Sequence, residues 1–101
     1  MKLTKRIEIY VPEIPGHEHE YQEAMRILAG LCGGSTETRA QGAWIDDSGN
    51  IINDNIHLVY AYYNRLSFAG IREILDYVHY MKQELKQELV SVTFAGALHL
   101  I

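Results

Sequence analysis

The stretch that most restricts the fold is the segment Gly33–Asn64, which the sequence predicts to be one long β-hairpin. Two strand-forming runs, about Thr36–Ile45 and Ile51–Tyr63, flank the tip Asp46–Asn50, which is rich in residues that tolerate tight or left-handed backbone. Each run is longer than an ordinary strand of about 5–6 residues. We therefore expect the hairpin to extend beyond its sheet and to bend or fray near the polar interruption Asn53–Asn55.

A strand and a helix are predicted before the hairpin. Residues 5–11 alternate between apolar and polar side chains, as a half-buried strand does, and a loop with two prolines follows at 12–16. From His17 to Cys32 apolar residues recur at steps of three and four, which predicts a helix that ends at Gly33-Gly34.

A second helix and a last strand are predicted after the hairpin. Ser67 is a suitable N-cap for a helix at about Phe68–Glu88, and Leu89–Ala95 alternates as a strand. The order strand, helix, strand, strand, helix, strand predicts an α+β, ferredoxin-like βαββαβ sandwich, in which two helices cover one face of a four-stranded antiparallel sheet. The length of 101 residues fits a single domain, 1–101. The tail Gly96–Ile101 is too apolar to be left loose in water.

Composition argues against several partners. The formal net charge is −4 and the nine Lys and Arg residues form no basic stripe, so we expect no nucleic-acid binding. No apolar run approaches the roughly 18 residues that span a bilayer, and no segment resembles a signal peptide, so we expect no membrane contact and a cytoplasmic protein. Cys32 is the lone cysteine, and we interpret it as a small buried hydrophobe.

No motif fixes a reaction, so the sequence predicts no catalytic residue, metal or cofactor. His17-Glu18-His19-Glu20 resembles a metal cluster, but on an ideal helix His17 and His19 would point about 200° apart. The sequence therefore favours a solvated helix start over a metal site. The other histidines lack a cysteine partner or a nucleophile at a recognisable spacing.

Aromatic residues give the strongest indication of a binding surface. Seven Tyr and one Trp are a heavy load for a small domain, and such side chains suit surfaces that are apolar yet form hydrogen bonds. Tyr10 and Tyr63 are interpreted as interface residues, whereas Tyr60 and Tyr62 fit an interface and a core equally well. The candidate ligand-binding residues are Thr36, Arg39, Trp44, His57, Tyr60, Tyr62 and Tyr63.

The hairpin pattern Gly33-Gly34-Ser35-Thr36, Gly42-Ala43-Trp44, Gly49 and Asp54 resembles one found in small, mostly uncharacterised ferredoxin-like proteins of bacteria and phages. The match covers about Gly33–Tyr62. The resemblance implies the fold and a site near the base of the hairpin, and it implies no catalytic residue.

Three functions remain open at this point. The first is a non-enzymatic oligomeric module that binds a small ligand between subunits, in a regulatory or sequestering role. The second is a small enzyme of the dimeric α+β barrel kind, in which His57, Tyr63 and Arg39 act as acid, base and anion-binding group. An RNA-recognition domain ranks last, because the charge is wrong for it.

The predicted partner is a second copy of this chain. One face of the predicted sheet carries Tyr10 and one side of the strand 56–63, and no helix covers it. The tail Leu98–Ile101 is likewise expected to have no partner inside the monomer. We expect at least a homodimer through this open face, with help from this tail.

Overall fold

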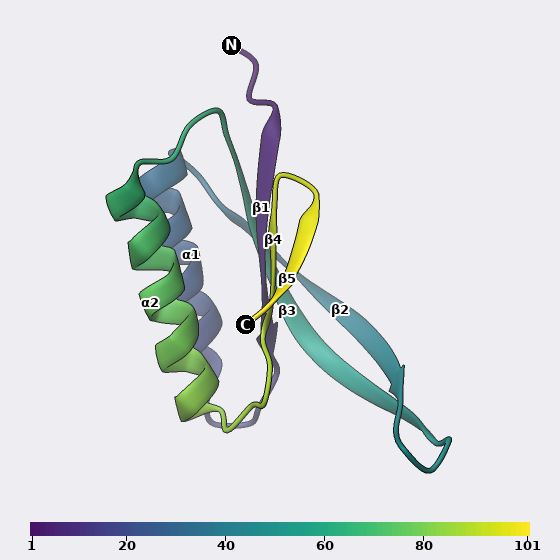
Figure 1. The fold of residues 1–101 in the computed structure, drawn as a ribbon. Helices are drawn as coiled ribbons and strands as arrows, with labels where there is room; N and C mark the ends of the chain where they lie inside the picture. Colours follow the sequence, from purple (N-terminus) through teal and green to yellow (C-terminus); the bar gives the residue numbers. More distant parts are fainter.

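The computed structural model describes all 101 residues as two helices on one face of a five-stranded antiparallel sheet (Figure 1). The α+β class and the helices on one face are confirmed, whereas the predicted count of four strands is wrong. The strands follow the order β2-β3-β1-β4-β5 in the sheet, so the first four have the ferredoxin-like arrangement and the fifth is added at an edge. The elements are β1 (Lys5–Pro12), α1 (Glu18–Cys32), β2 (Thr36–Ile45), β3 (Ile51–Tyr63), α2 (Phe68–Glu84), β4 (Ser91–Phe94) and β5 (Ala97–Leu100).

The fifth strand is the apolar tail. A two-residue turn at Ala95-Gly96, where φ is +49° and +90°, reverses the chain so that β5 pairs with β4. Val90 and Ile101 exchange two backbone hydrogen bonds of 2.8 and 2.9 Å, which close the far end of this hairpin. The tail was expected to lack a partner within the monomer, and this expectation is wrong because the turn supplies one.

Helix α2 begins where the sequence predicted and ends earlier. The Ser67 side chain accepts a hydrogen bond of 3.0 Å from the backbone N–H of Gly70, as an N-cap does. The helix ends at Glu84 instead of Glu88, because Lys86 takes a left-handed backbone with φ of +53°. The predicted last strand is correspondingly shorter, and it begins at Ser91.

The core lies between the sheet and the two helices. The apolar residues of β1 alternate inward as predicted, and α1 contributes Ala24, Ile27 and Leu28 from one side. Gly33, with φ of +89°, ends α1 by donating its backbone N–H to the carbonyl of Ala29. The buried side chains from the sheet and α2 are Ile7, Ile9, Val11, Val59, Ala61, Tyr63, Ile74, Tyr77, Val78, Met81 and Val92, with Leu85 and Val90 from the segment between α2 and β4.

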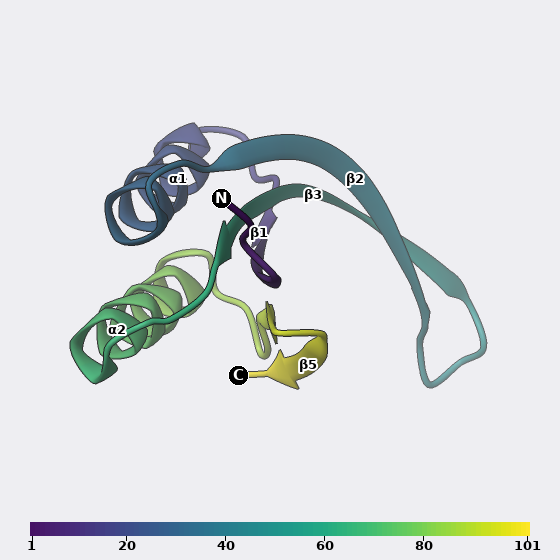
Figure 2. The same ribbon diagram turned by 90° about the horizontal axis from the view of Figure 1, so that it is seen from above.

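The hairpin β2–β3 extends beyond the sheet, as predicted. Its two strands pair without interruption from the tip to Thr36↔Tyr60, whereas β1 pairs with β3 only from Ile56 onward. Pairs such as Ala43↔Asn53 show that the polar interruption does not fray. The hairpin instead curves away from the rest of the molecule (Figure 2).

The face of the sheet opposite the helices is only partly covered. Tyr10 and Leu58 are half-buried there, and Arg6 lies 3.8 Å from the centre of the Tyr60 ring. Arg6 Nη1 also donates a hydrogen bond of 3.1 Å to the hydroxyl of Tyr62. Part of this aromatic surface is therefore engaged within the chain. Neither helix is long and apolar enough to cross a membrane.

The homodimer through the open face stays a prediction, and Tyr10 tests it. Replacing Tyr10 with Glu should give monomers, because a charge would have to be buried against the second copy. Analytical ultracentrifugation of both proteins at equal concentration measures this. Tyr80→Glu is the matched control, since Tyr80 is exposed on α2, away from the open face. A wild-type monomer, or a Tyr10→Glu variant that sediments like the wild type, would contradict the prediction.

Candidate functional site

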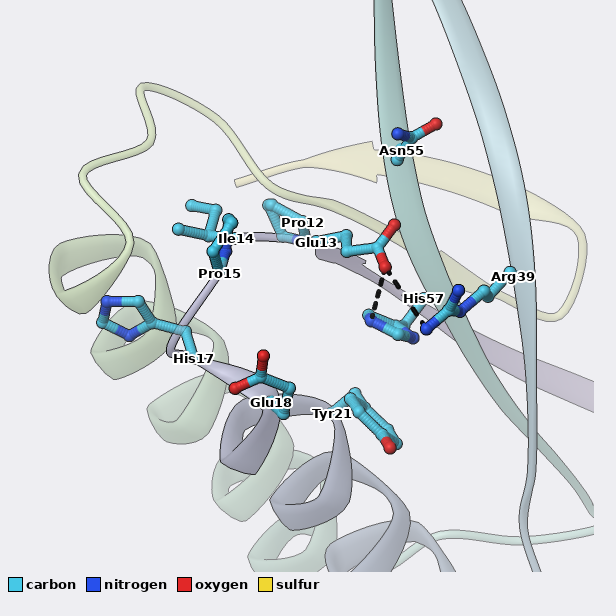
Figure 3. Close-up of a pocket in the computed structure, with 10 residues that line it drawn as sticks. All are labelled: Pro12, Glu13, Ile14, Pro15, His17, Glu18, Tyr21, Arg39, Asn55 and His57. Atoms are coloured by element: carbon cyan, nitrogen blue, oxygen red, sulfur yellow. Dashed lines mark ion pairs between the residues drawn. The ribbon is translucent and has the colours of Figure 1, made fainter.

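A polar pocket of about 440 Å³ lies where the loop after β1 and the first turn of α1 face the base of the hairpin (Figure 3). The loop is held in place by its backbone, since the N–H of Glu13 donates to the carbonyl of Asn55 on β3 at 2.9 Å. This bond continues the strand pairing past the end of β1 and sets the Glu13 side chain beside β3. The lining residues with ionisable side chains are Glu13, His17, Glu18, Tyr21, Arg39 and His57.

His57 is the buried centre of this pocket, with 5% of its surface exposed. It lies on the helix-facing side of β3, where the alternation of the strand places it in line with Val59. Its Nδ1 is 2.7 Å from Oε1 of Glu37, and its ring stacks on Tyr21 with centres 4.2 Å apart at 18°. A carboxylate at Nδ1 favours the tautomer that carries its proton there, which leaves Nε2 as the basic nitrogen.

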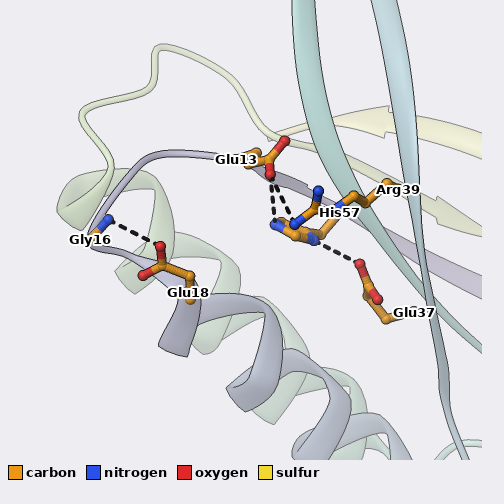
Figure 4. A network of polar contacts seen from close by, with 6 residues as sticks. All are labelled: Glu13, Gly16, Glu18, Glu37, Arg39 and His57. Carbon is orange, nitrogen blue, oxygen red and sulfur yellow. Dashed lines mark hydrogen bonds and ion pairs between the residues drawn. The ribbon is translucent and has the colours of Figure 1, made fainter.

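Glu13 and Arg39 complete the polar network (Figure 4). Oε1 of Glu13 lies 3.9 Å from Nε2 of His57 and 3.5 Å from Nη2 of Arg39. A proton taken up at Nε2 would give an imidazolium between two carboxylates, Glu13 and Glu37, which stabilise the charge. The Arg39 side chain is 77% exposed, so its remaining N–H groups are free to bind an anion.

The pocket carries an excess of negative charge. Hydrogen bonds from the backbone N–H groups of Glu18 itself and of Gly16 lower the pKa of the Glu18 carboxyl below its usual value. Glu18 therefore stays ionised in the neutral range, and the carboxyl groups of Glu18 and Glu13 share the pocket with the single guanidinium of Arg39. A ligand with net positive charge and one anionic group would complement this arrangement.

Among the predicted site residues, the structure brings Arg39 and His57 together and leaves Tyr63 apart. Arg39 is the cross-strand partner of His57. Tyr63 lies six positions further along β3, roughly 20 Å away at the usual rise per residue. It is 9% exposed within the core, and burial, with a smaller effect from Cys32, raises the pKa of its hydroxyl. His57, Arg39 and Tyr63 of one chain therefore form no catalytic triad, and Tyr63 is no surface residue.

The other predicted residues lie on the opposite face of the hairpin. Trp44 is 52% exposed, and its Nε1 donates a hydrogen bond of 2.9 Å to Oδ2 of Asp54. It borders a second hollow, of about 620 Å³, that also includes Tyr10. Thr36 pairs with Tyr60, and Tyr60 and Tyr62 contact Arg6. These residues do not join the His57 pocket.

Sequence reasoning missed Glu13, Glu37 and Tyr21. The signal for Glu37 was present, because an antiparallel register that pairs Ile45 with Ile51 at the tip places residues 37 and 39 beside His57. Tyr21 belongs to the three- and four-residue periodicity that predicted α1, and it does lie against the core, but its ring also covers His57. Glu13 had no such signal, since its position depends on the path of the proline loop.

Searches for similar proteins give a match at the level of structure only. No protein-family model matches the chain, and no curated protein matches it. Two solved structures resemble it in fold, both of a phage SAM lyase: one in complex with S-methyl-5'-thioadenosine and one in the apo state. Each has a TM-score of 0.56, covers 96% of this chain and 86% of its own, and shares 15% and 14% of its residues, respectively, with this chain.

These comparisons contradict the interpretation of the chain as a non-enzymatic oligomeric module. The two solved structures whose fold it shares over nearly its whole length are structures of an enzyme. The alternative interpretation, a small enzyme, agrees better with these neighbours, but Tyr63 is not part of the residue set that the structure brings together. The polar network around His57 is assembled from three segments distant in sequence, so no local motif indicated it.

Glu37 should contribute measurably to stability. Replacing Glu37 with Ala removes the only hydrogen bond of the buried His57 ring, which should cost about 1–3 kcal/mol of unfolding free energy. Urea unfolding followed by circular dichroism measures this. Glu23→Ala is the control, because Glu23 pairs with Arg26 on an exposed helix face and such pairs contribute about 0–1 kcal/mol. Equal losses in the two variants would contradict a special role for the Glu37–His57 pair.

Proposed function

We propose that this chain is a small enzyme that cleaves S-adenosylmethionine (SAM) and releases S-methyl-5'-thioadenosine, with the His57 pocket as its active site. The observation that carries the proposal is the likeness of fold, over 96% of the chain, to a SAM lyase. One fold can host many reactions. The choice of residues therefore rests on the pocket and its charges.

The charges of the pocket are complementary to those of SAM. The substrate carries a sulfonium and an ammonium group, both positive, and one carboxylate. Glu13 and Glu18 supply two carboxylates, and Arg39 supplies a guanidinium suited to bidentate pairing with the substrate carboxylate. The aromatic face of Tyr21 favours a neighbouring cation. The pocket volume of about 440 Å³ lies within the range of small-molecule sites, about 300–1,000 Å³.

Release of S-methyl-5'-thioadenosine requires cleavage of the bond between sulfur and Cγ of the amino-acid portion. The electron pair of this bond goes to sulfur, which loses its positive charge. Without water, the four-carbon fragment leaves by one of two routes. Its own carboxylate oxygen attacks Cγ and closes a lactone, or a base removes a proton from Cβ and an alkene forms.

Residues of the pocket act in both routes. Arg39 fixes the substrate carboxylate, which is the nucleophile in the first route and a bystander in the second. His57 accepts the Cβ proton at Nε2 in the second route, where Glu37 and Glu13 stabilise the imidazolium. In the first route His57 acts as a positioning residue that holds Glu13 near the sulfonium.

The test is a direct assay with SAM, in which chromatography follows S-methyl-5'-thioadenosine and mass spectrometry identifies the four-carbon product. His57→Gln and Arg39→Ala should each lower the rate by about 100-fold or more, the usual contribution of acid–base and positioning groups. A lactone identifies the first route and the alkene identifies the second.

Two controls make this assay decisive. A sample without protein corrects for spontaneous decay of SAM, and Arg72→Ala removes an exposed arginine of α2 that does not line the pocket. The Arg72→Ala variant should keep the wild-type rate. Product formation no faster than in the protein-free sample would refute the proposed reaction. Equal activity of wild type, His57→Gln and Arg39→Ala would refute the assignment of the site.

A further inference from the structure

We propose that His17, His19 and Glu20, at the start of α1, form a binding site for a divalent transition metal of the Zn²⁺ type. One potential ligand atom from each of the three residues lies within 4.8 Å of the others. This inference does not depend on the reaction proposed for the His57 pocket. It rests on the geometry, the burial and the charge of this cluster alone.

The geometry differs from the ideal helix that argued against a metal. His17 is the residue before the helix, with φ of −119° and ψ of +31°, so helical spacing does not determine the direction of its side chain. Its backbone N–H donates to the carbonyl of Ile14 at 3.0 Å, which fixes the loop at this point. The rings of His17 and His19 consequently lie on the same side, with centres 5.7 Å apart.

Two buried ligand atoms of the cluster lack a hydrogen-bond partner. Glu20 is 1% exposed, and its Oε1 accepts no hydrogen bond; Nδ1 of His17 is buried and likewise unpaired. Nε2 of His19 approaches Oε1 of Glu20 to 2.8 Å, but this close approach is not aligned as a hydrogen bond. Buried polar atoms are normally satisfied, because leaving them unpaired is costly. A cation between the three side chains would satisfy these atoms together.

The surroundings also favour a cation. A hollow beside His19 and Glu20 is lined by the further carboxylates of Glu23, Glu73 and Asp76. The cation in this hollow, Arg26, is already held by Glu23 through hydrogen bonds of 2.6 and 3.0 Å. The remaining negative charge attracts a divalent ion to the open side of the cluster.

The hydroxyl of Tyr77 fixes the turn that carries the buried ligand. It donates a hydrogen bond of 2.5 Å to the backbone carbonyl of Glu20. Glu20 is thereby held in a fixed place, and the exposed His19 can adjust to it.

The ligand set selects the kind of metal. Two imidazoles and one carboxylate are the protein ligands of many zinc sites that leave a fourth position open, whereas Mg²⁺ and Ca²⁺ prefer oxygen ligands. Ligands at about 2.1 Å from zinc lie about 3.4 Å from one another. The three ligand atoms already lie within 4.8 Å of one another, and the His19 side chain, which is 63% exposed, has room to adjust its distance to the other two.

Binding of Zn²⁺ to the metal-free full-length protein tests the proposal. Isothermal titration calorimetry should show about one Zn²⁺ per chain, and Co²⁺ used as a substitute should give the visible absorption of a low-coordinate site. His17→Ala and His19→Ala should each weaken binding by roughly tenfold or more, and Glu20→Gln should do the same if it folds. His79→Ala is the matched control, because His79 is an exposed histidine of α2 outside the cluster.

Each outcome decides the proposal. Stoichiometric binding that His17→Ala and His19→Ala weaken and His79→Ala leaves unchanged would support it. No binding by the wild type would overturn it, as would binding that survives both substitutions. Loss of binding in His57→Ala with retention in His17→Ala would also overturn it, since the metal would then lie at Glu13, Glu37 and His57.

Discussion

The candidate site depends first on the antiparallel register of β2 and β3. This register places Arg39 opposite His57 on the face that the helices cover. A slip by one residue would turn every side chain of the moved strand to the other face. The register is set at the far tip, where the carboxylate of Asp46 accepts hydrogen bonds of 2.9 Å from the backbone of Ser48 and of Asn50. The chemistry at the base of the hairpin therefore depends on a turn distant from it.

The ring nitrogens of a buried histidine need polar partners, because water cannot reach them. In His57 these partners are charged side chains instead of backbone groups. Glu37 binds one nitrogen, and Glu13 lies near the other. The stacked ring of Tyr21 covers the face and limits access of water from that side. The second carboxylate and the neighbouring Arg39 place several charged groups around one buried imidazole, and this marks the position as a candidate for chemistry.

The sequence allowed much of the fold to be predicted, because periodicity and caps are local signals. Both hairpin strands and the N-cap Ser67 follow from such patterns. The fifth strand did not, because its turn uses Ala95 with a positive φ, a conformation that alanine seldom adopts. At the site, the sequence offered Arg39 and His57 as separate candidates, and only the register of the hairpin brings them together. Glu13 reaches them through the path of a loop that no sequence pattern describes.

That loop links the two candidate sites. Residues 12–17 carry Glu13 to the His57 pocket at one end and His17 to the cluster with His19 and Glu20 at the other. His17 also lines the pocket, so this residue belongs to both sites. The prolines restrict this segment to few conformations. Any ligand that fixes His17 would further restrict the position of Glu13, and a ligand that draws Glu13 inward would shift His17. Binding at one site should for this reason alter the affinity at the other, and by linkage the effect must be equal in both directions.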